Sequence, residues 1–350
     1  MVSSTKKNGK YVSETRMIKS KWSLCFLLIL FLALAFLPLV TSQHILSLVI
    51  LISITLTAVH GVNIVLGYCG EITVAQAAFV GISAYCYAIL SGAGCPWIIA
   101  MLGGILLTCF CGVLFGLPAL RVKGFYLLMV TLGAQFIIPW VFSHWKSMTG
   151  GLVWGKPVPE IRIGGIAIDS DLKKYFLIVG ISVVMTFIAV NVRRARVGRA
   201  LMAIRDNDLA AEAMGINVFG YKLIAFLLCS FFAGVSGFMW AIYTGHLFPD
   251  HFYLMDSVWY IAMLIVGGMG TVPGAIMGTA FLLILSEITV VYGPFIAKLL
   301  PLEFGAASGV SFGSILFAVV IMLFLIYEPR GINHRMQIVK DRLRSFFVKG

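Results

Sequence analysis

The stretch GRALMAIRDNDLAAEAMGIN, Gly198–Asn217, is a polar and charged insert between two long apolar runs. Arginines crowd its start, which places it on the cytoplasmic side if the runs beside it cross a membrane. Asn207 or Asp208 can cap a short helix by accepting a backbone N–H, and Gly215 can end that helix in the left-handed conformation. A helix of about two turns is too short to be stable alone in water. We therefore expect a partner to hold it.

Composition places the rest of the chain in a membrane. Of the 350 residues, 60% are apolar and 11% are charged, and the mean hydropathy is +1.01. Soluble domains carry about 25% charged residues. The apolar runs also have lengths near the roughly 20 residues that a spanning helix needs. The sequence therefore predicts an all-α integral membrane protein.

Ten apolar runs, each interpreted as one transmembrane helix, place both termini in the cytoplasm. The runs are Trp22–Val40, Ile45–Leu66, Thr73–Leu90, Trp97–Leu120, Phe125–His144, Tyr175–Val192, Phe219–Tyr243, Leu254–Val266, Thr271–Val291 and Gly309–Tyr327. The predicted organisation is a basic tail (1–21), a transmembrane domain (22–328) and a second basic tail (329–350). The transmembrane domain contains an external loop (145–174) and a cytoplasmic loop (193–218). A long basic leader without a clear cleavage site favours an uncleaved first helix over a secretory signal.

The charge distribution supports this topology. The net charge is +12, but all except six of the 26 Lys and Arg residues lie in the two tails, the 121–123 turn or the 193–222 loop. Short cytoplasmic loops of membrane proteins carry such an excess of positive charge. Basic tails beside apolar helices also favour an anionic lipid surface. We therefore expect contact with membrane lipid and no binding of nucleic acid.

Glycine-rich breaks interrupt the apolar pattern twice, at Gly67–Glu71 and at Gly267–Gly270. The second break follows the short run Leu254–Val266, so this run is either a span or a broken, re-entrant helix. In transporters, breaks that recur in the two halves indicate the translocation pathway. Small residues such as Gly81 and Gly274 are equally typical of close helix packing. Both interpretations stay open.

Few ionisable residues lie within or at the edges of the runs. We expect Glu71 and Asp256 at helix starts, where an acid complements the helix dipole. Glu287 is expected near an outer boundary. His60 and Asn63 lie within a run, and we expect them to form hydrogen bonds between helices rather than to bind a ligand.

No catalytic motif is present. The nearest approach to a phosphate-binding loop is Gly215–Gly220, but Tyr221 follows where a lysine is required. The seven cysteines lie in or beside apolar runs without metal-ligand spacing, so we expect buried free thiols and no metal site. With few acids in the spans, ion coupling is disfavoured, and energy has to come from a separate subunit.

Six blocks of sequence resemble the LivM-type inner-membrane permeases of branched-chain amino acid ABC importers. The blocks are GYCGEITVAQAAFVGISAY (Gly67–Tyr85), LRVKGFYLLMVTLG (Leu120–Gly133), TGG (Thr149–Gly151), the GRALMAIRDNDLAAEAMGINVFGYKLIAF block beginning at Gly198, LIVGGMGTVPGAIMGTAF (Leu264–Phe281) and EPRGI (Glu328–Ile332). They occur in the family's order. The Ala211–Gly215 stretch is a degenerate form of the loop with which ABC permeases meet their ATPases, and residues 1–21 lie outside the resemblance.

The resemblance implies a non-enzymatic permease subunit in the bacterial inner membrane. Its partners would be a LivH-type permease, two cytoplasmic ATPases that bind ATP and Mg, and an extracytoplasmic binding protein, while this chain binds no cofactor. The implied substrates are leucine, isoleucine and valine. Urea, amides and aromatic or other carboxylates are alternatives within the family. An ion-coupled carrier or a channel for small organic solutes is the alternative of another class.

The resemblance also assigns three sets of candidate residues. The ATPase-coupling loop comprises Arg199, Ala200, Leu201, Ile204, Arg205, Asp208, Ala211, Glu212, Ala213 and Gly215. The candidate translocation pathway comprises Gly67, Gly70, Glu71, Gln76, Gly81, Gly267, Gly268, Gly270 and Gly274. Thr149, Gly150 and Gly151 are candidates for docking the binding protein.

Overall fold

The computed structural model describes residues 43–119, 125–163, 166–167 and 170–299, together with Pro38 and a few residues between 318 and 336. The chain divides into two units, Met1–Ser42 and Gln43–Gly350, and the fold is given for the second. The predicted first run lies outside the described residues except for Pro38, and the last run lies almost wholly outside them.

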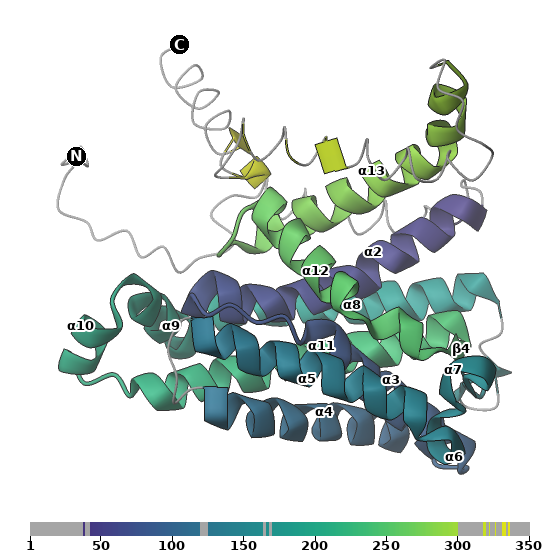
Figure 1. Cartoon of the computed structure of the whole chain (residues 1–350), viewed down its shortest axis with the longest axis horizontal. Coiled ribbons are helices and arrows are strands. Elements are labelled where there is room, and N and C mark those ends of the chain that lie inside the picture. Colours follow the sequence, from purple (N-terminus) through teal and green to yellow (C-terminus); the bar gives the residue numbers. More distant parts are fainter. Residues whose placement is uncertain are drawn as a thin grey trace. The chain divides into compact units, whose positions relative to one another are not determined.

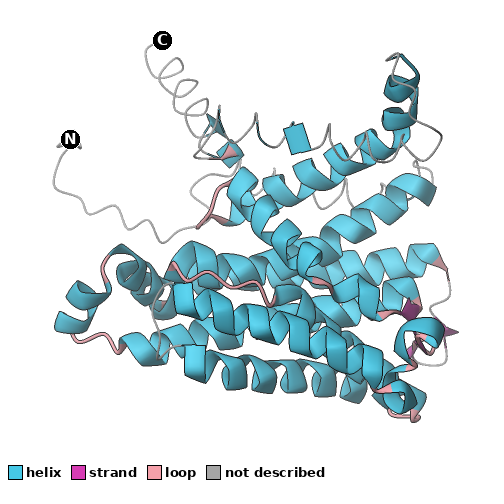
Figure 2. Ribbon diagram, in the orientation of Figure 1, coloured by secondary structure: helices cyan, strands magenta, loops and turns pink. Residues whose placement is uncertain are grey.

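Helices make up most of the described part of the second unit (Figure 2). The long helices are α2 (Gln43–Val62), continued by the π-helical η1 (Asn63–Cys69), α3 (Gln76–Gly92), α4 (Trp97–Ala119), α5 (Phe125–His144), α8 (Asp171–Arg194), α11 (Val218–Thr244), α12 (Leu254–Gly267) and α13 (Val272–Leu299). The shorter helices are α6 (Lys146–Thr149), α7 (Gly151–Trp154), α9 (Arg196–Asp206), α10 (Asp208–Ala213) and the 3-10 helix η2 (Pro249–Phe252).

Strands among the described residues form two short antiparallel pairs. The strands are β1 (Lys156–Pro157), which pairs with β4 (His246–Leu247), and β2 (Arg162–Ile163), which pairs with β3 (Ile166–Ala167). In the second pair, Arg162 lies opposite Ala167 and Ile163 lies opposite Ile166.

Local sequence sets several helix ends. The side chain of Asn217 accepts a hydrogen bond from the Gly220 amide at the start of α11, and Gly245 ends that helix with φ of 66°. Asp256 forms a capping box with Tyr253 at the start of α12, which confirms the expected position of this acid.

The helices α3, α4 and α11 pack against one another, α5 packs on α3 and α4, and α2 packs on α11, α8 and α13 (Figure 1). Glycine allows some of these close approaches. A Cβ at Gly237 of α11 would lie only 2.1 Å from the Val80 carbonyl oxygen of α3. His60 on α2 shares a hydrogen bond of 3.1 Å with the Thr186 hydroxyl on α8, which confirms the predicted bond between helices.

Six helices in the described part of the chain are long and apolar enough to cross a membrane. They are Gln43–Cys69, Trp97–Leu117, Tyr126–His144, Asp171–Arg194, Val218–Thr244 and Val272–Val291. The 17-residue α3 is apolar but shorter. The architecture is therefore that of an all-α membrane protein.

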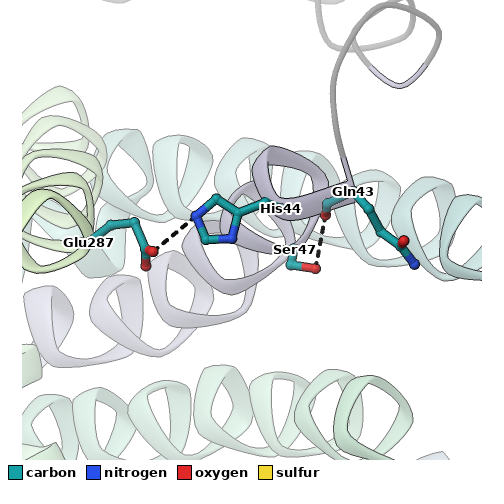
Figure 3. A network of polar contacts seen from close by, with 4 residues as sticks. All are labelled: Gln43, His44, Ser47 and Glu287. Atoms are coloured by element: carbon teal, nitrogen blue, oxygen red, sulfur yellow. Dashed lines mark hydrogen bonds and ion pairs between the residues drawn. The ribbon is translucent and has the colours of Figure 1, made fainter. Parts of the chain in front are cut away.

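Polar contacts join three of these helices at one end of the bundle. At the start of α2, Gln43 donates to Asp171 on α8 at 2.6 Å, and His44 lies 3.0 Å from Glu287 on α13 (Figure 3). The side chain of Glu287 is 35% exposed. The N-terminal ends of α2 and α8 therefore meet, so these two helices run in the same direction. This agrees with the order of spans expected from the sequence.

The helix α12 begins inside the bundle rather than at its end. The Ser257 hydroxyl donates to Gln135, near the middle of α5, at 3.0 Å, and Gln135 donates to the Phe252 carbonyl at 2.8 Å. The Ala77 amide at the start of α3 donates to the same hydroxyl at 2.8 Å. Because α12 has 14 residues, it is about 21 Å long, which is less than the roughly 30 Å of a bilayer core. The helix α12 is therefore shorter than a bilayer core, and Gly268 at its C-cap separates it from α13.

Candidate functional site

The polar insert forms a pair of helices, α9 and α10, which we call the α9–α10 segment (Arg196–Ala213). The first helix is amphipathic, and Ala200, Leu201 and Ile204 bury their side chains. Asn207 caps α10 by accepting a hydrogen bond from the Ala210 amide at 3.0 Å. Gly215 follows α10 with φ of 83°. The predicted cap and the left-handed glycine are both confirmed. The sequence indicated one helix of about two turns, whereas the structure has two helices, because the residues of α9 are helical as well.

Two apolar side chains in or directly after this segment are exposed. Leu209 is 68% exposed and Met214 is 84% exposed, whereas Ala211 is buried. Glu212 and Ala213 are exposed beside them. The sequence reasoning missed Leu209 and Met214, although apolar residues in a polar stretch that do not continue the buried stripe of α9 are a usable signal.

The arginines of α9 point to different partners. Arg199 donates to the Arg194 carbonyl at the end of α8, at 2.5 Å. Arg205 donates to the Gly67 carbonyl, also at 2.5 Å, and so reaches the first glycine break. Asp208, the first residue of α10, also takes part in an interaction within the folded chain. Of the candidate coupling residues, Arg205 is therefore turned toward the helix bundle.

The two glycine breaks lie against each other. The Gly270 amide donates to the Asn63 side chain at 2.9 Å, and Asn63 donates to the Thr271 carbonyl at 3.3 Å. Asn63 is therefore hydrogen-bonded to the connection between α12 and α13 rather than to another helix. A Cβ at Gly67 would lie 2.7 Å from the Gly270 nitrogen. Candidate pathway residues 203 positions apart in the sequence are thus in contact.

The closing EPRGI block (Glu328–Ile332) also contacts the second glycine break. Gly331 has φ of 78°, and a Cβ there would lie 2.6 Å from the Gly268 nitrogen. Asn333 donates to the Thr271 hydroxyl at 3.0 Å. Blocks from the first, middle and last parts of the chain therefore meet at the glycine breaks.

Other candidate pathway residues are in packed surroundings. Gln76 is buried and donates to the Ala58 carbonyl at 2.9 Å. A Cβ at Gly81 would lie 2.8 Å from the Phe142 ring, and one at Gly274 would lie 2.4 Å from the Gly268 carbonyl oxygen. At Gly81 and Gly274 the structure has the close packing that was one of the two interpretations.

Glu71 is not at a helix start, so that prediction is wrong. Gly70 ends η1 with φ of 79°, and the chain runs without helix as far as Gln76, where α3 begins. Glu71 instead forms an ion pair with Lys222, in the early part of α11. Their side chains are only 14% and 11% exposed, so the two charges compensate each other in a largely desolvated place.

The predicted docking residues in the outer segment shape a turn. Thr149 is buried and donates to the Phe142 carbonyl at 2.6 Å, and Gly151 is buried beside it. Gly150 has φ of 78° between α6 and α7. The strongly exposed side chains come directly after this turn, where Val153 and Trp154 are each 81% exposed. A partner would meet these two residues before it met the TGG residues.

The described residues contain no group of three His, Cys, Asp or Glu side chains that could hold a metal ion. The cysteines among them are free thiols. Cys69 and Cys229 are buried as expected, whereas Cys86, Cys95, Cys109 and Cys111 are partly exposed.

Known proteins with similar sequences are permeases. The high-affinity branched-chain amino acid transport system permease protein LivM of Salmonella typhimurium is 28% identical over 65% of this chain and 59% of its own length, so the match spans less than two thirds of that protein. The protein of the same name from Escherichia coli is 27% identical over 90% of this chain and 75% of its own length. A probable LivM from Methanocaldococcus jannaschii is 22% identical over 71% of each chain. No solved structure matches the chain.

The matched family is one of transport subunits, and no enzymatic family is indicated. With its apolar helices, the chain is a multi-pass inner-membrane protein. A model of the branched-chain amino acid transport system permease components matches residues 44–327, which is most of the sequence. The chain therefore belongs to that family of permease components.

Proposed function

We propose that this chain is the permease subunit of an ATP-driven ABC importer for leucine, isoleucine and valine. The observation that carries the proposal is the α9–α10 segment, which exposes Leu209, is followed directly by the exposed Met214, and contacts the first glycine break through Arg205. Relatives named as branched-chain amino acid permeases support the substrate class. The chain would span the membrane ten times, with both termini and the α9–α10 segment in the cytoplasm.

The partners follow from this role. A LivH-type permease would complete the translocation pathway, and two cytoplasmic ATPases would bind ATP and Mg, while this chain binds no cofactor itself. Leu209 and Met214 would enter a groove of one ATPase, the helix-in-groove mode in which apolar side chains supply most of the affinity. On the other side of the membrane, Val153 and Trp154 would meet the extracytoplasmic binding protein.

One pair of matched variants tests both contacts. Met214→Glu and Val153→Glu make the same change at side chains that are 84% and 81% exposed. We expect Met214→Glu to lower retention of the ATPases on the purified chain by about tenfold or more, because a charge replaces an apolar anchor. Met214→Glu should leave capture of the binding protein unchanged. Val153→Glu should lower capture of the binding protein and leave retention of the ATPases unchanged. Equal effects of both variants on both partners would contradict the assignment of the two surfaces.

Substrate identity needs a separate experiment. We would measure ligand binding by the partner binding protein over leucine, isoleucine, valine, urea and aromatic acids, and then ATP-dependent uptake of the bound ligand by the reconstituted complex. Binding of urea or an aromatic acid but of no aliphatic amino acid would overturn the substrate and leave the importer in place. Uptake driven by an ion gradient in the isolated chain would overturn the importer itself.

A further inference from the structure

Arg205 lies at the end of α9 that faces the helix bundle, and its guanidinium donates to the Gly67 carbonyl at 2.5 Å. This carbonyl belongs to the last turn of η1, where backbone acceptors lack partners within the helix. The amides of Gly70 and Glu71 both turn to the Val65 carbonyl instead. A cation at a helix C-terminus also complements the negative end of the helix dipole. A positively charged arginine therefore suits this position, because it meets both the Gly67 carbonyl and the negative end of the helix dipole.

The same side chain touches both glycine breaks. A Cβ at Gly70 would lie 3.0 Å from Arg205 Cγ, and a Cβ at Gly270 would lie 3.0 Å from Arg205 Nη1. The aliphatic stem of Arg205 thus lies across the first break, and its guanidinium lies against the second. Asn63 already ties the two breaks together through the Gly270 amide. One side chain of α9 is consequently in contact with a joined pair of backbone breaks.

We propose that Arg205 is a positioning residue that links the α9–α10 segment to the two glycine breaks, so that a movement of the segment displaces both breaks together. Arginine suits this task because its planar guanidinium offers several donors in a fixed geometry and keeps its charge. Arg196, at the start of the same helix, is exposed and provides a matched control. The part of the proposal that concerns transport rests on the proposed function.

The link itself can be tested on the purified full chain without any partner. Backbone amide exchange reports local opening. We expect Arg205→Ala to speed exchange about tenfold in peptides that cover 66–71 and 267–271, while Arg196→Ala leaves both peptides unchanged. Arg205→Lys should protect 66–71 better than 267–271, because an ammonium can reach one carbonyl but cannot lie across both breaks. Unchanged exchange at both breaks in Arg205→Ala would overturn the link.

The coupling role is tested on the complete transporter in proteoliposomes, with radiolabelled leucine and ATP. We expect Arg205→Ala to keep its ATPases through purification and to hydrolyse ATP, yet to import about tenfold less leucine per ATP. Arg196→Ala should keep the wild-type ratio, and Arg205→Lys should lie between the two. A ratio within about twofold of wild type in Arg205→Ala would overturn the coupling role. Loss of the ATPases from Arg205→Ala would overturn it as well and make Arg205 a docking residue.

The two experiments separate the inference from the proposed function. If no ATPase accompanies even the wild-type chain, the importer assignment fails, and with it the coupling role. The exchange experiment then still decides whether Arg205 holds the two breaks.

Discussion

Replacement of Gly278 by alanine should force α12 and α13 apart. A Cβ at Gly278 on α13 would lie 1.9 Å from the Met263 carbonyl oxygen and 2.7 Å from the Gly267 nitrogen, whereas ordinary van der Waals contact begins at 3.4 Å. Both neighbours are backbone atoms of α12, so no side chain can rotate away. The helix has to move instead, and the cluster around Leu264 and Val59 loses contacts.

The size of the effect follows from two opposing contributions. Overpacking of a close interface costs about 1–3 kcal/mol, and a backbone-to-backbone clash belongs at the upper end of that range. Alanine in a helix gains about 0.5–1 kcal/mol over glycine through backbone entropy. We expect a net loss of about 2 kcal/mol, which lowers the apparent Tm by roughly 4 °C.

Gly180→Ala on α8 is the matched control, because a Cβ at Gly180 meets no atom within 4 Å. This variant keeps the entropic gain without the clash, so its apparent Tm should equal or slightly exceed that of the wild type. Thermal unfolding in one detergent and at one scan rate compares the variants, since unfolding of such proteins is often irreversible. Equal apparent Tm values for Gly278→Ala and Gly180→Ala would refute the reasoning from backbone contact.

Three further predictions concern buried polar contacts and a helix cap. Lys222→Met should cost about 3–5 kcal/mol because it leaves the Glu71 carboxylate desolvated without its partner, whereas adding Glu71→Gln should recover most of that loss in the same thermal assay. Asn207→Ala should remove about 1 kcal/mol from α10 and speed its amide exchange, and Asn207→Asp should restore protection. Thr186→Val should cost about 1–3 kcal/mol, because His60 Nδ1 already lacks a hydrogen-bond partner among the described residues and Nε2 would then lose its own. An unchanged Tm in Thr186→Val would show that this bond between helices contributes little.

Local chemistry made much of the fold predictable. The run Phe125–His144 is bounded by polar residues and coincides with α5, and the short run from Leu254 coincides with the start of α12. Asn207 and Gly215 define α10 through hydrogen bonds and dihedral angles of their immediate neighbours. Each of these features depends on residues close in the sequence, which is why the sequence alone indicated them.

The contacts of the site could not be predicted because they join distant residues. Arg205 and Gly67 are 138 positions apart, and Lys222 and Glu71 are 151 positions apart. The interpretation of Glu71 as a dipole partner failed because Gly70 ends η1 with a left-handed residue and helix α3 does not begin until Gln76. Only the folded chain decides which charge meets which carbonyl.

The glycines at the breaks differ in what they contact. One allows the backbones of two helices to pack closely, and two others lie against the Arg205 side chain. Gly267 belongs to the backbone contact between α12 and α13, where any added side chain meets a carbonyl or an amide. Gly70 and Gly270 instead leave room for the stem and the guanidinium of Arg205. The contact at Gly267 resists sliding because backbone atoms cannot give way, whereas contacts with a long side chain can adapt. With Arg205 in its proposed role, a movement of α9 would therefore reach the breaks at Gly70 and Gly270, while the backbone contact at Gly267 keeps α12 and α13 together.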